Sequence, residues 1–286
     1  MGLFITNLLP GMLESCCRIR ACSFKCQHRT EGVVLASITG NAIIIGGGSG
    51  IGGATAVAFA QAGAAGLMIA DIDLNTAEST ASDIMAILKQ SDYRVEAVVM
   101  DVTDQESIES AFKKTADSFG RIDYCVTSAG DVNATGTFYV RRTALATMRA
   151  QEPKPNFPDA LHRGNTRGSI VALGSALSIN AAPYFIQYTT SKQAVLGLVK
   201  TAALDSVNDN IRVNCVSPCW PESNMTKQLK QDIPQLENTM ASNVPMGRLG
   251  FPEEIADATL FLCSPRASLV TETSLIADGG MCVSLG

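Results

Sequence analysis

Tyr188 and Lys192 have the residue types and the spacing that proton transfer requires. On a helix, residues four positions apart lie on one face, so the phenol and the ammonium would point at the same place. A neighbouring positive charge stabilises a phenolate and would lower the pKa of Tyr188 below its usual value of about 10. We therefore expect Tyr188 to exchange a proton with an alcohol or a ketone. Taken alone, the pair also fits two exposed residues on one helix face.

A glycine-rich segment predicts a phosphate-binding turn. The β-branched run Ala42–Ile45 is typical of a buried strand, the segment Gly46–Gly53 follows it, and a helical pattern from Ala54 then ends near Gly63. Glycines let the backbone approach a pyrophosphate closely, and the amides at the start of the helix hold its negative charge. A strand, a glycine turn and a helix in this order form the context of a dinucleotide site.

Asp71 follows the next predicted strand, Gly66–Ala70, and lies 19 residues after Gly52 (71 − 52). A carboxylate at this spacing accepts hydrogen bonds from both hydroxyls of an adenosine ribose and repels a 2′-phosphate. The glycine turn contains no Arg or Lys to bind such a phosphate, so both observations favour NAD over NADP. Asp71 is alternatively a cap or a turn residue, although Asp73 is better placed to cap the helix predicted over Asn75–Lys89.

The rest of the chain alternates strand and helix patterns. The further predicted elements are strands at Arg94–Met100, Tyr124–Thr127, Gly168–Leu173 and Ile211–Val216, and an amphipathic helix at Asp104–Phe119. This alternation predicts an α/β, Rossmann-type doubly wound parallel sheet of about seven strands with helices on both faces. Ligands bind beyond the carboxyl ends of such strands. The residues at those ends are Gly46, Asp71, Asp101, Ser128, Ser175 and Ser217.

Composition limits the class of protein. The chain has 286 residues, of which 46% are hydrophobic and 17% charged, so it can bury the core of one large domain, predicted over residues 41–286. A net charge of -5 argues against a nucleic-acid partner. No apolar run is long enough to span a membrane. The nine cysteines fall mostly in apolar runs, which indicates reduced, buried thiols in a cytoplasmic protein.

Residues 1–40 are predicted to form a poorly ordered N-terminal extension. They carry four cysteines among several basic residues, but His28 is alone, so no zinc site is expected. The segment does not have the pattern of a secretory signal. The start Met1–Thr6 fits the loose myristoylation pattern, and Cys16 and Cys17 are candidate palmitate acceptors. Lipid anchoring or targeting therefore stays open.

Over residues 40 to 286 these motifs together resemble the short-chain dehydrogenase/reductase family. Tyr188 and Lys192 match its YxxxK motif, and Ser175 precedes Tyr188 by 13 residues (188 − 175), the family's spacing for the catalytic serine. The segments that match its other motifs are Ile45–Gly52 (TGxxxGxG, with Ile45 in place of Thr), Asp71, Asp101-Val102, Thr127–Gly130 (NNAG), Gly247–Gly250, Pro252–Ala256 and Asp278–Gly280.

The resemblance implies an NAD(P)-dependent oxidoreductase that acts on CH–OH groups. Tyr188 would take the proton of a substrate hydroxyl while hydride passes to nicotinamide, Lys192 would lower the tyrosine's pKa, and Ser175 would hydrogen-bond the substrate oxygen. Asn133 would complete a proton relay. The implied cofactor-binding residues are Gly46, Ser49, Gly50, Ile51, Gly52, Asp71, Asp101, Val102, Ser128, Ala129, Gly130, Tyr188, Lys192, Pro218 and Ser223.

Three segments depart from the family pattern. Asn133 follows Gly130 by only three residues, where the family usually has about twenty or more, so a segment that normally borders the substrate cleft is missing. In Pro218–Ser223 a cysteine replaces the usual glycine, and Pro221 has no N–H to donate to the cofactor, although Ser223 keeps a hydroxyl. Gln151–Arg167 is a Pro-rich insertion predicted to be a surface loop, similar to insertions in fungal family members that act in secondary metabolism.

The substrate is expected to be a hydrophobic secondary alcohol or ketone. The stretch expected to line its pocket is mostly apolar: Ala176, Leu177, Ile179, Ala181, Ala182, Phe185, Ile186 and the region from Trp220 to Asn243. The apolar residues of Ala194–Val199 are expected to pack against a second subunit, because the family forms homodimers and homotetramers. The three departures leave an alternative open, in which an impaired member of the family binds a nucleotide or a partner without turnover.

Overall fold

The computed structural model describes residues 38–89, 93–129, 134–219 and 241–283. The N-terminal extension predicted over residues 1–40 lies almost entirely outside these ranges and stays a prediction, as does the domain boundary at residue 41. Among the described residues, no helix is long and apolar enough to cross a membrane.

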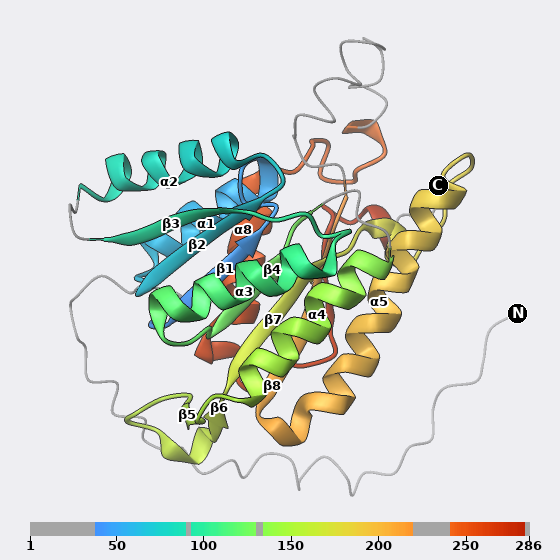
Figure 1. Cartoon of the computed structure of the whole chain (residues 1–286). Coiled ribbons are helices and arrows are strands. Elements are labelled where there is room, and N and C mark those ends of the chain that lie inside the picture. The colour runs from blue at the N-terminus through green and yellow to red at the C-terminus, as the bar shows by residue number, and fades with distance from the viewer. Residues whose placement is uncertain (1–37, 90–92, 130–133, 220–240, 284–286) are drawn as a thin grey trace, which may run out of the picture. The chain divides into compact units, whose positions relative to one another are not determined.

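Seven parallel strands form the central sheet in the order β3-β2-β1-β4-β7-β8-β9 (Figure 1). The strands are β1 (Asn41–Ile45), β2 (Gly66–Asp71), β3 (Arg94–Val99), β4 (Tyr124–Thr127), β7 (Gly168–Leu173), β8 (Ile211–Pro218) and β9 (Ser274–Ala277). The first strand, β1, lies inside the sheet, and β2 and β3 follow on one side of it. The strands β4, β7, β8 and β9 then follow in chain order on the other side of β1. The prediction of a doubly wound parallel sheet is confirmed, and the point where the strand order reverses lies between β1 and β4.

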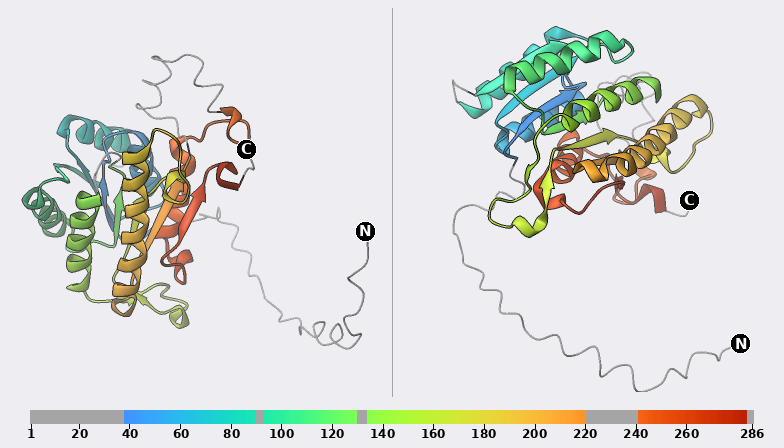
Figure 2. Two further views of the ribbon diagram at one scale, coloured as in Figure 1. Left: turned by 90° about the vertical axis from the view of Figure 1, so that its right-hand side faces the viewer. Right: turned by 60° about the horizontal axis from the view of Figure 1, so that its bottom comes forward.

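Helices cover both faces of the sheet (Figure 2). They are α1 (Gly50–Gln61), α2 (Leu74–Leu88), α3 (Gln105–Phe119), α4 (Ala134–Arg149), α5 (Ile186–Ser206) and α8 (Pro252–Cys263). Side chains of β1 alternate between the faces, so Ile43 and Ile45 join the core beneath α3, α4 and α5, while Ala42 and Ile44 join the core beneath α1, α2 and α8. All five residues of β1 are buried, as the continuous apolar run predicts for a parallel strand.

The starts of α2 and α3 confirm the helix signals of the sequence. Asp73 caps α2 by accepting a hydrogen bond from the backbone N–H of Asn75 at 3.0 Å, as predicted. Asp104 caps α3 in the same way, with the N–H of Glu106 at 3.0 Å. A carboxylate at the N-cap satisfies an amide that has no partner within the helix.

The insertion before β7 is more ordered than the surface loop predicted for Gln151–Arg167. It contains a two-stranded antiparallel sheet of β5 (Lys154–Pro155) and β6 (Asn165–Thr166), with a 3-10 turn at Leu161–Arg163 between them. The predicted surface position is confirmed, because residues 151–167 are all partly or fully exposed, but the short strand pair was not predicted. The prediction relied on proline and polar composition, which does not report the long-range side-chain bonds that hold the two strands.

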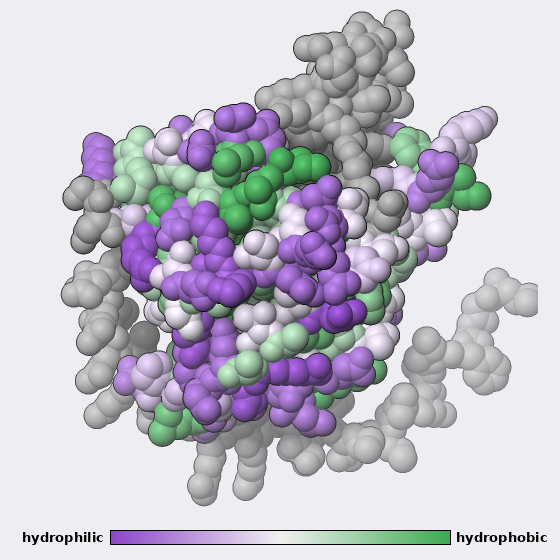
Figure 3. All heavy atoms as spheres, in the orientation of Figure 1, coloured by the Kyte–Doolittle hydropathy of each residue, from purple (hydrophilic) through white to green (hydrophobic). Residues whose placement is uncertain are grey.

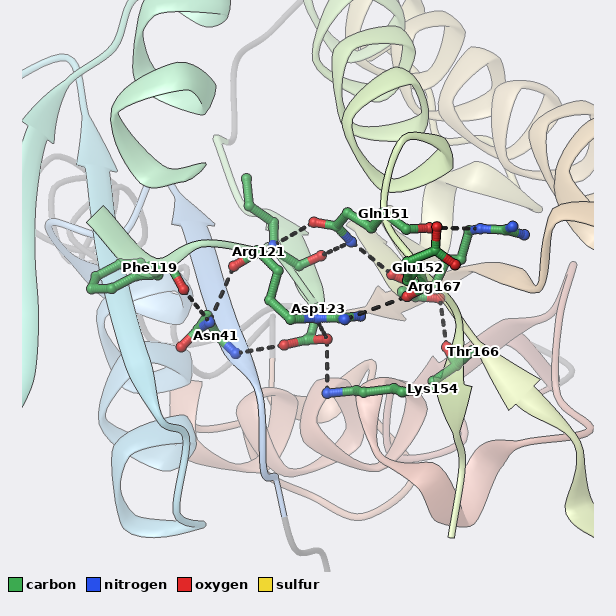
Figure 4. Close-up of polar contacts among 11 residues, drawn as sticks. Asn41, Phe119, Arg121, Asp123, Gln151, Glu152, Lys154, Thr166 and Arg167 are labelled. Carbon is green, nitrogen blue, oxygen red and sulfur yellow. Dashed lines mark hydrogen bonds and ion pairs between the residues drawn. The ribbon is translucent and has the colours of Figure 1, made fainter. Parts of the chain in front are cut away.

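Those bonds belong to a group that we call the amino-edge cluster: Asn41, Arg121, Asp123, Gln151, Lys154 and Arg167 (Figure 4). The Asp123 side chain is only 3% exposed, and it forms ion pairs with Arg121 Nε at 2.7 Å and Lys154 Nζ at 2.8 Å. Its second oxygen accepts the backbone N–H of Asn41 at 2.9 Å. Gln151 bonds both backbone groups of Ile122 and the carbonyl of Arg167. The cluster ties the insertion to the amino ends of β1, β4 and β7.

The described cysteines are free thiols, and Cys125, Cys215 and Cys263 are buried, as their apolar surroundings in the sequence predict. Burial raises the pKa of Cys125 and of Cys263 to about 12. These thiols are therefore neutral near pH 7 and behave as small apolar core residues.

Candidate active site

The glycine turn after β1 has the close backbone approach that a dinucleotide site requires. Gly46 has a φ of +74°, and a Cβ at this position would lie 2.7 Å from the backbone N of Ala129. A Cβ at Gly52 would lie 2.0 Å from the carbonyl oxygen of Gly46. Any side chain at these two positions would push the turn apart, so the two glycines are needed for its geometry.

The start of α1 differs from the starts of α2 and α3. Ser49 is the N-cap residue of α1, but its side chain makes no capping hydrogen bond, and the first turn of the helix contains no acidic residue. The N-terminal amides of α1 therefore keep their capacity to donate, and the helix dipole adds partial positive charge there. This arrangement suits a pyrophosphate.

Asp71 ends β2 beside the glycine turn. Its Oδ2 accepts the backbone N–H of Gly48 at 2.9 Å, and its Oδ1 accepts the N–H of Asp73 at 3.2 Å. Asp71 is half-buried, so the carboxylate is held at the turn and remains accessible from one side. Each carboxylate oxygen keeps a lone pair for a ribose hydroxyl.

The residues predicted to surround the adenine and the nicotinamide ribose follow the neighbouring strands. Asp101 accepts two hydrogen bonds from Thr103, one from the hydroxyl at 2.7 Å and one from the N–H at 2.8 Å, and these bonds lower the pKa of Asp101. Val102 is half-buried against the core. Ser128 donates its N–H to the carbonyl of Ile45 at 2.8 Å, which continues the pairing of β1 and β4 into the loop.

Tyr188 and Lys192 lie one turn apart on α5, as predicted. Lys192 is 6% exposed, and its Nζ lies 5.6 Å from the centroid of the Tyr188 ring. The same Nζ donates a hydrogen bond to the carbonyl of Leu173, the last residue of β7, at 3.2 Å. The ammonium thus sits between the end of a central strand and the face of the phenol. A cation so placed favours the phenolate form of the tyrosine.

Ser175 lies two residues after β7, and its Oγ accepts the backbone N–H of Leu177 at 3.1 Å. This residue is 6% exposed and caps the 3-10 turn Ala176–Ser178. Ser178 connects it to the lysine turn, because Ser178 Oγ accepts the N–H of Ser175 at 3.0 Å and donates to the carbonyl of Lys192 at 2.9 Å. The structure therefore brings three of the four predicted catalytic positions, Ser175, Tyr188 and Lys192, to one edge of the sheet.

A small cavity of about 10 Å³ lies beside Lys192 at the carboxyl edge of the sheet. Its walls come from the ends of β1, β4 and β7, from two loop residues and from the N-terminal halves of α4 and α5: Ile45, Val102, Thr127, Ala129, Gly136, Thr137, Val140, Leu173, Lys192 and Val195. This volume holds about one water molecule. The described residues therefore enclose a space next to the lysine.

Three predicted site residues, Gly130, Asn133 and Ser223, lie outside the described residues, so their roles stay predictions. Pro218 is the last residue of β8 and pairs with Ala277 of β9. Cys219 is not among the described non-glycine residues with positive φ, so the chain accommodates a cysteine here without the left-handed conformation that a glycine would permit.

The apolar stretch after Ser175 divides into two parts. Ala176 and Leu177 are 2% and 7% exposed, which fits the alternative that they belong to the core, and their place in a substrate pocket stays a prediction. Ile179, Phe185 and Ile186 are exposed, and the last two lie within three residues of Tyr188 in the chain. The distinction depends on the 3-10 turn that follows Ser175, which the apolar composition alone does not reveal.

Within Ala194–Val199, the structure separates core residues from Ala194, Leu196 and Leu198, which stay partly exposed, so the contact with a second subunit stays a prediction. Val195 and Val199 belong to the core between α5 and the sheet, so they are unavailable to a second subunit. Leu204 is 68% exposed on the same helix.

Figure 3 shows mainly hydrophilic side chains over α3 and α4, with apolar side chains gathered above them toward the upper edge of that face.

Ser178 was not predicted from the sequence, although it is a hydroxyl residue three positions after Ser175. Serine is common in turns, and its bond to the carbonyl of Lys192 spans 14 residues, so only the fold reveals it. Among the described residues, no group of three or more His, Cys, Asp or Glu side chains is arranged to hold a metal ion.

Comparisons with known proteins agree with this geometry. The profile of a family described as enoyl-(acyl carrier protein) reductase matches residues 46–282. The chain is 46% identical over 264 residues to the short-chain dehydrogenase fogB of Aspergillus ruber, covering 85% of this chain and 97% of the relative. It is 45% identical over 268 residues to the short-chain dehydrogenase RED2 of Pyricularia oryzae, covering 85% and 96%. A short-chain type dehydrogenase/reductase from Mycobacterium ulcerans has a similar structure, with a TM-score of 0.75, 25% identity, and coverage of 87% and 92%.

Proposed function

The chain belongs to the short-chain dehydrogenase/reductase family, and from this premise we propose that it is an NAD(H)-dependent enzyme that interconverts a hydrophobic secondary alcohol and its ketone. The family makes it an oxidoreductase with a nicotinamide cofactor. The choice of NAD, the roles of the individual residues and the class of substrate are our proposal. The similarity to several fungal short-chain dehydrogenases favours a place in secondary metabolism.

The residues at the carboxyl edge fit a dinucleotide. The turn at Gly46–Gly52 and the uncapped start of α1 would hold the pyrophosphate, and Asp71 would accept the hydroxyls of the adenosine ribose. Ile72, which is 70% exposed, and Val102 would offer apolar surface to the adenine. Bound NAD would supply the hydride acceptor for the reaction. A 2′-phosphate would meet the negative charge of Asp71, which is why NAD fits better than NADP.

Proton transfer is assigned to Tyr188. In oxidation, its phenolate would take the proton of the substrate hydroxyl, and in reduction the phenol would return a proton to the carbonyl oxygen. Lys192 stabilises the phenolate through its charge at 5.6 Å from the ring centroid. Ser175 would hydrogen-bond the substrate oxygen, where negative charge develops during transfer.

The substrate class follows from the surface beside Tyr188. Ile179, Phe185 and Ile186 are 42%, 43% and 79% exposed, and Tyr184 is fully exposed with a φ of +68°. A non-glycine residue in the left-handed conformation is strained, so this aromatic side chain is held outward at some cost. Exposed apolar side chains near the polar groups of Tyr188 and Ser175 favour a substrate that is mostly apolar and carries one hydroxyl or keto group.

The position of Lys192 is the observation on which the proposal rests. A lysine that is 6% exposed is costly to bury as a charge, and here it combines one backbone hydrogen bond to Leu173 with a place over the ring of Tyr188. A residue on an exposed helix face would have neither contact. The alternative reading of Tyr188 and Lys192 as surface residues therefore does not account for this burial.

Turnover of NAD with a panel of apolar secondary alcohols, and of NADH with the matching ketones, tests the proposal. Cofactor binding is followed in parallel by NADH fluorescence. Tyr188→Phe is expected to lower kcat by about 10³-fold, because it removes the hydroxyl that exchanges a proton with the substrate. NADH should still bind, because the glycine turn and Asp71 are unchanged. Binding of NADH without turnover of any substrate by either form would instead support an impaired member of the family.

The partner and location predictions extend the proposal. A homodimer or homotetramer would use exposed apolar residues such as Leu204 rather than Val195 and Val199. Light scattering of the purified chain, compared with a Leu204→Lys variant, measures the oligomeric state. Cytoplasmic location and lipid anchoring through the N-terminal segment stay predictions, which fractionation and mass spectrometry of the N-terminus would test.

A further inference from the structure

Ser178 occupies a position between two catalytic segments that are distant in the chain. Its side chain is 4% exposed and lies in the 3-10 turn between β7 and α5. One hydroxyl makes two bonds there. It accepts the N–H of Ser175 at 3.0 Å and donates to the backbone carbonyl of Lys192 at 2.9 Å. The bond to Lys192 links residues that are 14 positions apart.

From this geometry we infer that Ser178 is a positioning residue of the reaction, which sets the distance between the Ser175 turn and the Tyr188–Lys192 face of α5. The inference rests on the proposed function of these three residues. Ser178 itself has no contact with substrate in this assignment. It acts by holding the segments that carry the reacting groups.

The two ends of Lys192 are fixed to the same stretch of chain. Its side-chain Nζ donates to the carbonyl of Leu173 at 3.2 Å, and its backbone carbonyl accepts from Ser178. Leu173 and Ser178 flank Ser175 on either side. The serine turn and the lysine turn therefore form a closed loop of hydrogen bonds, and Tyr188 lies one helical turn before Lys192 on the same face.

The packing around Gly174 leaves little room for this loop to relax. A Cβ at Gly174 would lie 2.8 Å from Ser178 Oγ and 2.7 Å from Cys215 Sγ. The hydroxyl thus fills a narrow space between the end of β7, β8 and α5. Without it, the N–H of Ser175 would lose its bond inside the protein, where no bulk water replaces it.

The inference predicts how a hydroxyl deletion acts. Ser178→Ala removes both bonds, so the ammonium of Lys192 and the phenol of Tyr188 shift relative to Ser175. A shift of a fraction of an ångström at reacting groups lowers kcat by about tenfold or more. KM for NAD is expected to change less than kcat, because the glycine turn and Asp71, which would hold the pyrophosphate and the adenosine ribose, are not touched. The pH midpoint of kcat moves to higher pH, because the phenolate loses part of its stabilisation by the ammonium.

Ser206→Ala is the matched control. Like Ser178, Ser206 is a buried serine; it is the last residue of α5, and its hydroxyl donates to the carbonyl of Ala202 at 2.6 Å, far along the helix from Tyr188. Its removal is expected to lower the melting temperature without moving the pH midpoint. If Ser178→Ala lowers only the melting temperature and leaves both kcat and the pH midpoint as in the native chain, the inference is wrong.

A second readout does not require turnover. The ultraviolet absorbance of the phenolate, taken as the difference between each protein and its Tyr188→Phe form, reports the titration of Tyr188 directly. The midpoint is expected to lie at higher pH in Ser178→Ala than in the native chain and to be unchanged in Ser206→Ala. An unchanged midpoint in Ser178→Ala overturns the positioning role, whereas absence of turnover in the native chain overturns only the proposed function.

Discussion

The two ends of the parallel sheet use polar residues in opposite ways. At the amino end, both oxygens of Asp123 bond to Arg121, Lys154 and the backbone of Asn41, and the carboxylate is almost fully buried (Figure 4). At the carboxyl end, the start of α1 has no side-chain cap, and the carboxylate of Asp71 is half-exposed beside the glycine turn. One end satisfies its polar groups within the chain, and the other keeps donors and acceptors directed at a ligand.

The difference follows from the direction of the strands. Every crossover helix of a doubly wound sheet starts at the carboxyl edge, so helix N-termini and connecting loops gather there and can bind anions and reacting groups. At the amino edge lie the C-termini of the helices and the short loops that lead into the next strands. Unpaired backbone N–H groups at helix N-termini, which could bind a ligand, do not gather there. Buried polar groups at that edge must therefore find partners within the chain. We therefore expect substitutions at the carboxyl edge to lower mainly activity and substitutions at the amino edge to lower mainly the free energy of unfolding.

The largest effect is expected for Lys192→Met at the carboxyl edge. Removal of the ammonium takes away the charge that favours the phenolate of Tyr188, so kcat/KM should fall by at least about 100-fold, or about 3 kcal/mol in the barrier. Replacing a buried cation with an apolar side chain of similar length should leave the free energy of unfolding unchanged or slightly higher. Steady-state kinetics and urea unfolding measure the two quantities.

Lys154→Met at the amino edge is the matched control for that substitution. Lys154 pairs with Asp123 at 2.8 Å, and its side chain is 32% exposed. The variant should lose about 1 kcal/mol of stability and keep its kcat, because Arg121 still pairs with the carboxylate. Equal losses of activity in the two variants would mean that the two edges are not functionally distinct.

The next largest effect is expected for Asp123→Ala. Removing a buried carboxylate leaves two cations and a backbone amide without their acceptor, which costs about 3 kcal/mol of unfolding free energy. The midpoint of urea unfolding should fall, while kcat per folded molecule stays the same. Asp209→Ala serves as the comparison, because Asp209 pairs with Arg149 at 2.6 Å on the surface and should contribute less than about 1 kcal/mol. A similar cost in both variants would contradict the special position of the amino-edge cluster.

A smaller effect is expected for Asp71→Ser, which tests cofactor choice at the carboxyl edge. The serine keeps one hydrogen-bonding group and removes the negative charge that repels a 2′-phosphate. The ratio of kcat/KM for NAD to that for NADP should fall by about tenfold or more, with little change in the melting temperature. Asp73→Ser, at the neighbouring helix cap, should leave the ratio unchanged. A native chain that already prefers NADP would show that Asp71 does not select the cofactor.

The sequence predicted most of the fold because the central strands β1, β4 and β7 are buried on both faces, and their residues are mostly apolar. β4 and β7 begin and end at the predicted residues, and Asp73 caps α2 as its position indicates. The catalytic edge was also predictable, since a parallel strand places the residue after its last position at a known edge. Local patterns of this kind are complete within a few residues.

Interactions between distant segments were not predictable in the same way. The hairpin of β5 and β6 is held by Lys154 and Arg167 through bonds to Asp123 and Gln151, and nothing in the composition of the insertion indicates those partners. The link from Ser178 to Lys192 depends likewise on how α5 returns to the end of β7. The apolar residues of Ala194–Val199 could face either the sheet or a second subunit, and only the fold shows that Val195 and Val199 face the sheet.

The smallest effect is expected for Glu254→Gln, which compares an exposed ion pair near the carboxyl edge with the buried one at Asp123. Glu254 lies in the first turn of α8 and binds Arg248 through two bonds of 2.6 Å and 2.8 Å. Mainly through these bonds, the pKa of Glu254 is lowered from 4.5 to about 2. A lowered native pKa means that the pair stabilises the fold above about pH 4.5 and that this contribution is lost as the pH falls toward 2.

Solvent limits the size of that contribution, because both side chains of the pair are 44% or more exposed. The free energy of unfolding of the native chain should therefore exceed that of Glu254→Gln by less than about 1 kcal/mol at pH 7. This difference should shrink below pH 4.5 and in high salt. Urea unfolding at several pH values measures it, with Glu253→Gln in the same helical turn as the control. A difference in unfolding free energy that stays constant from pH 7 to pH 3 would show that packing, rather than charge, makes the exposed pair stabilising. The exposed pair of Glu254 and the buried pairs of Asp123 would then differ in their burial and not in their electrostatics.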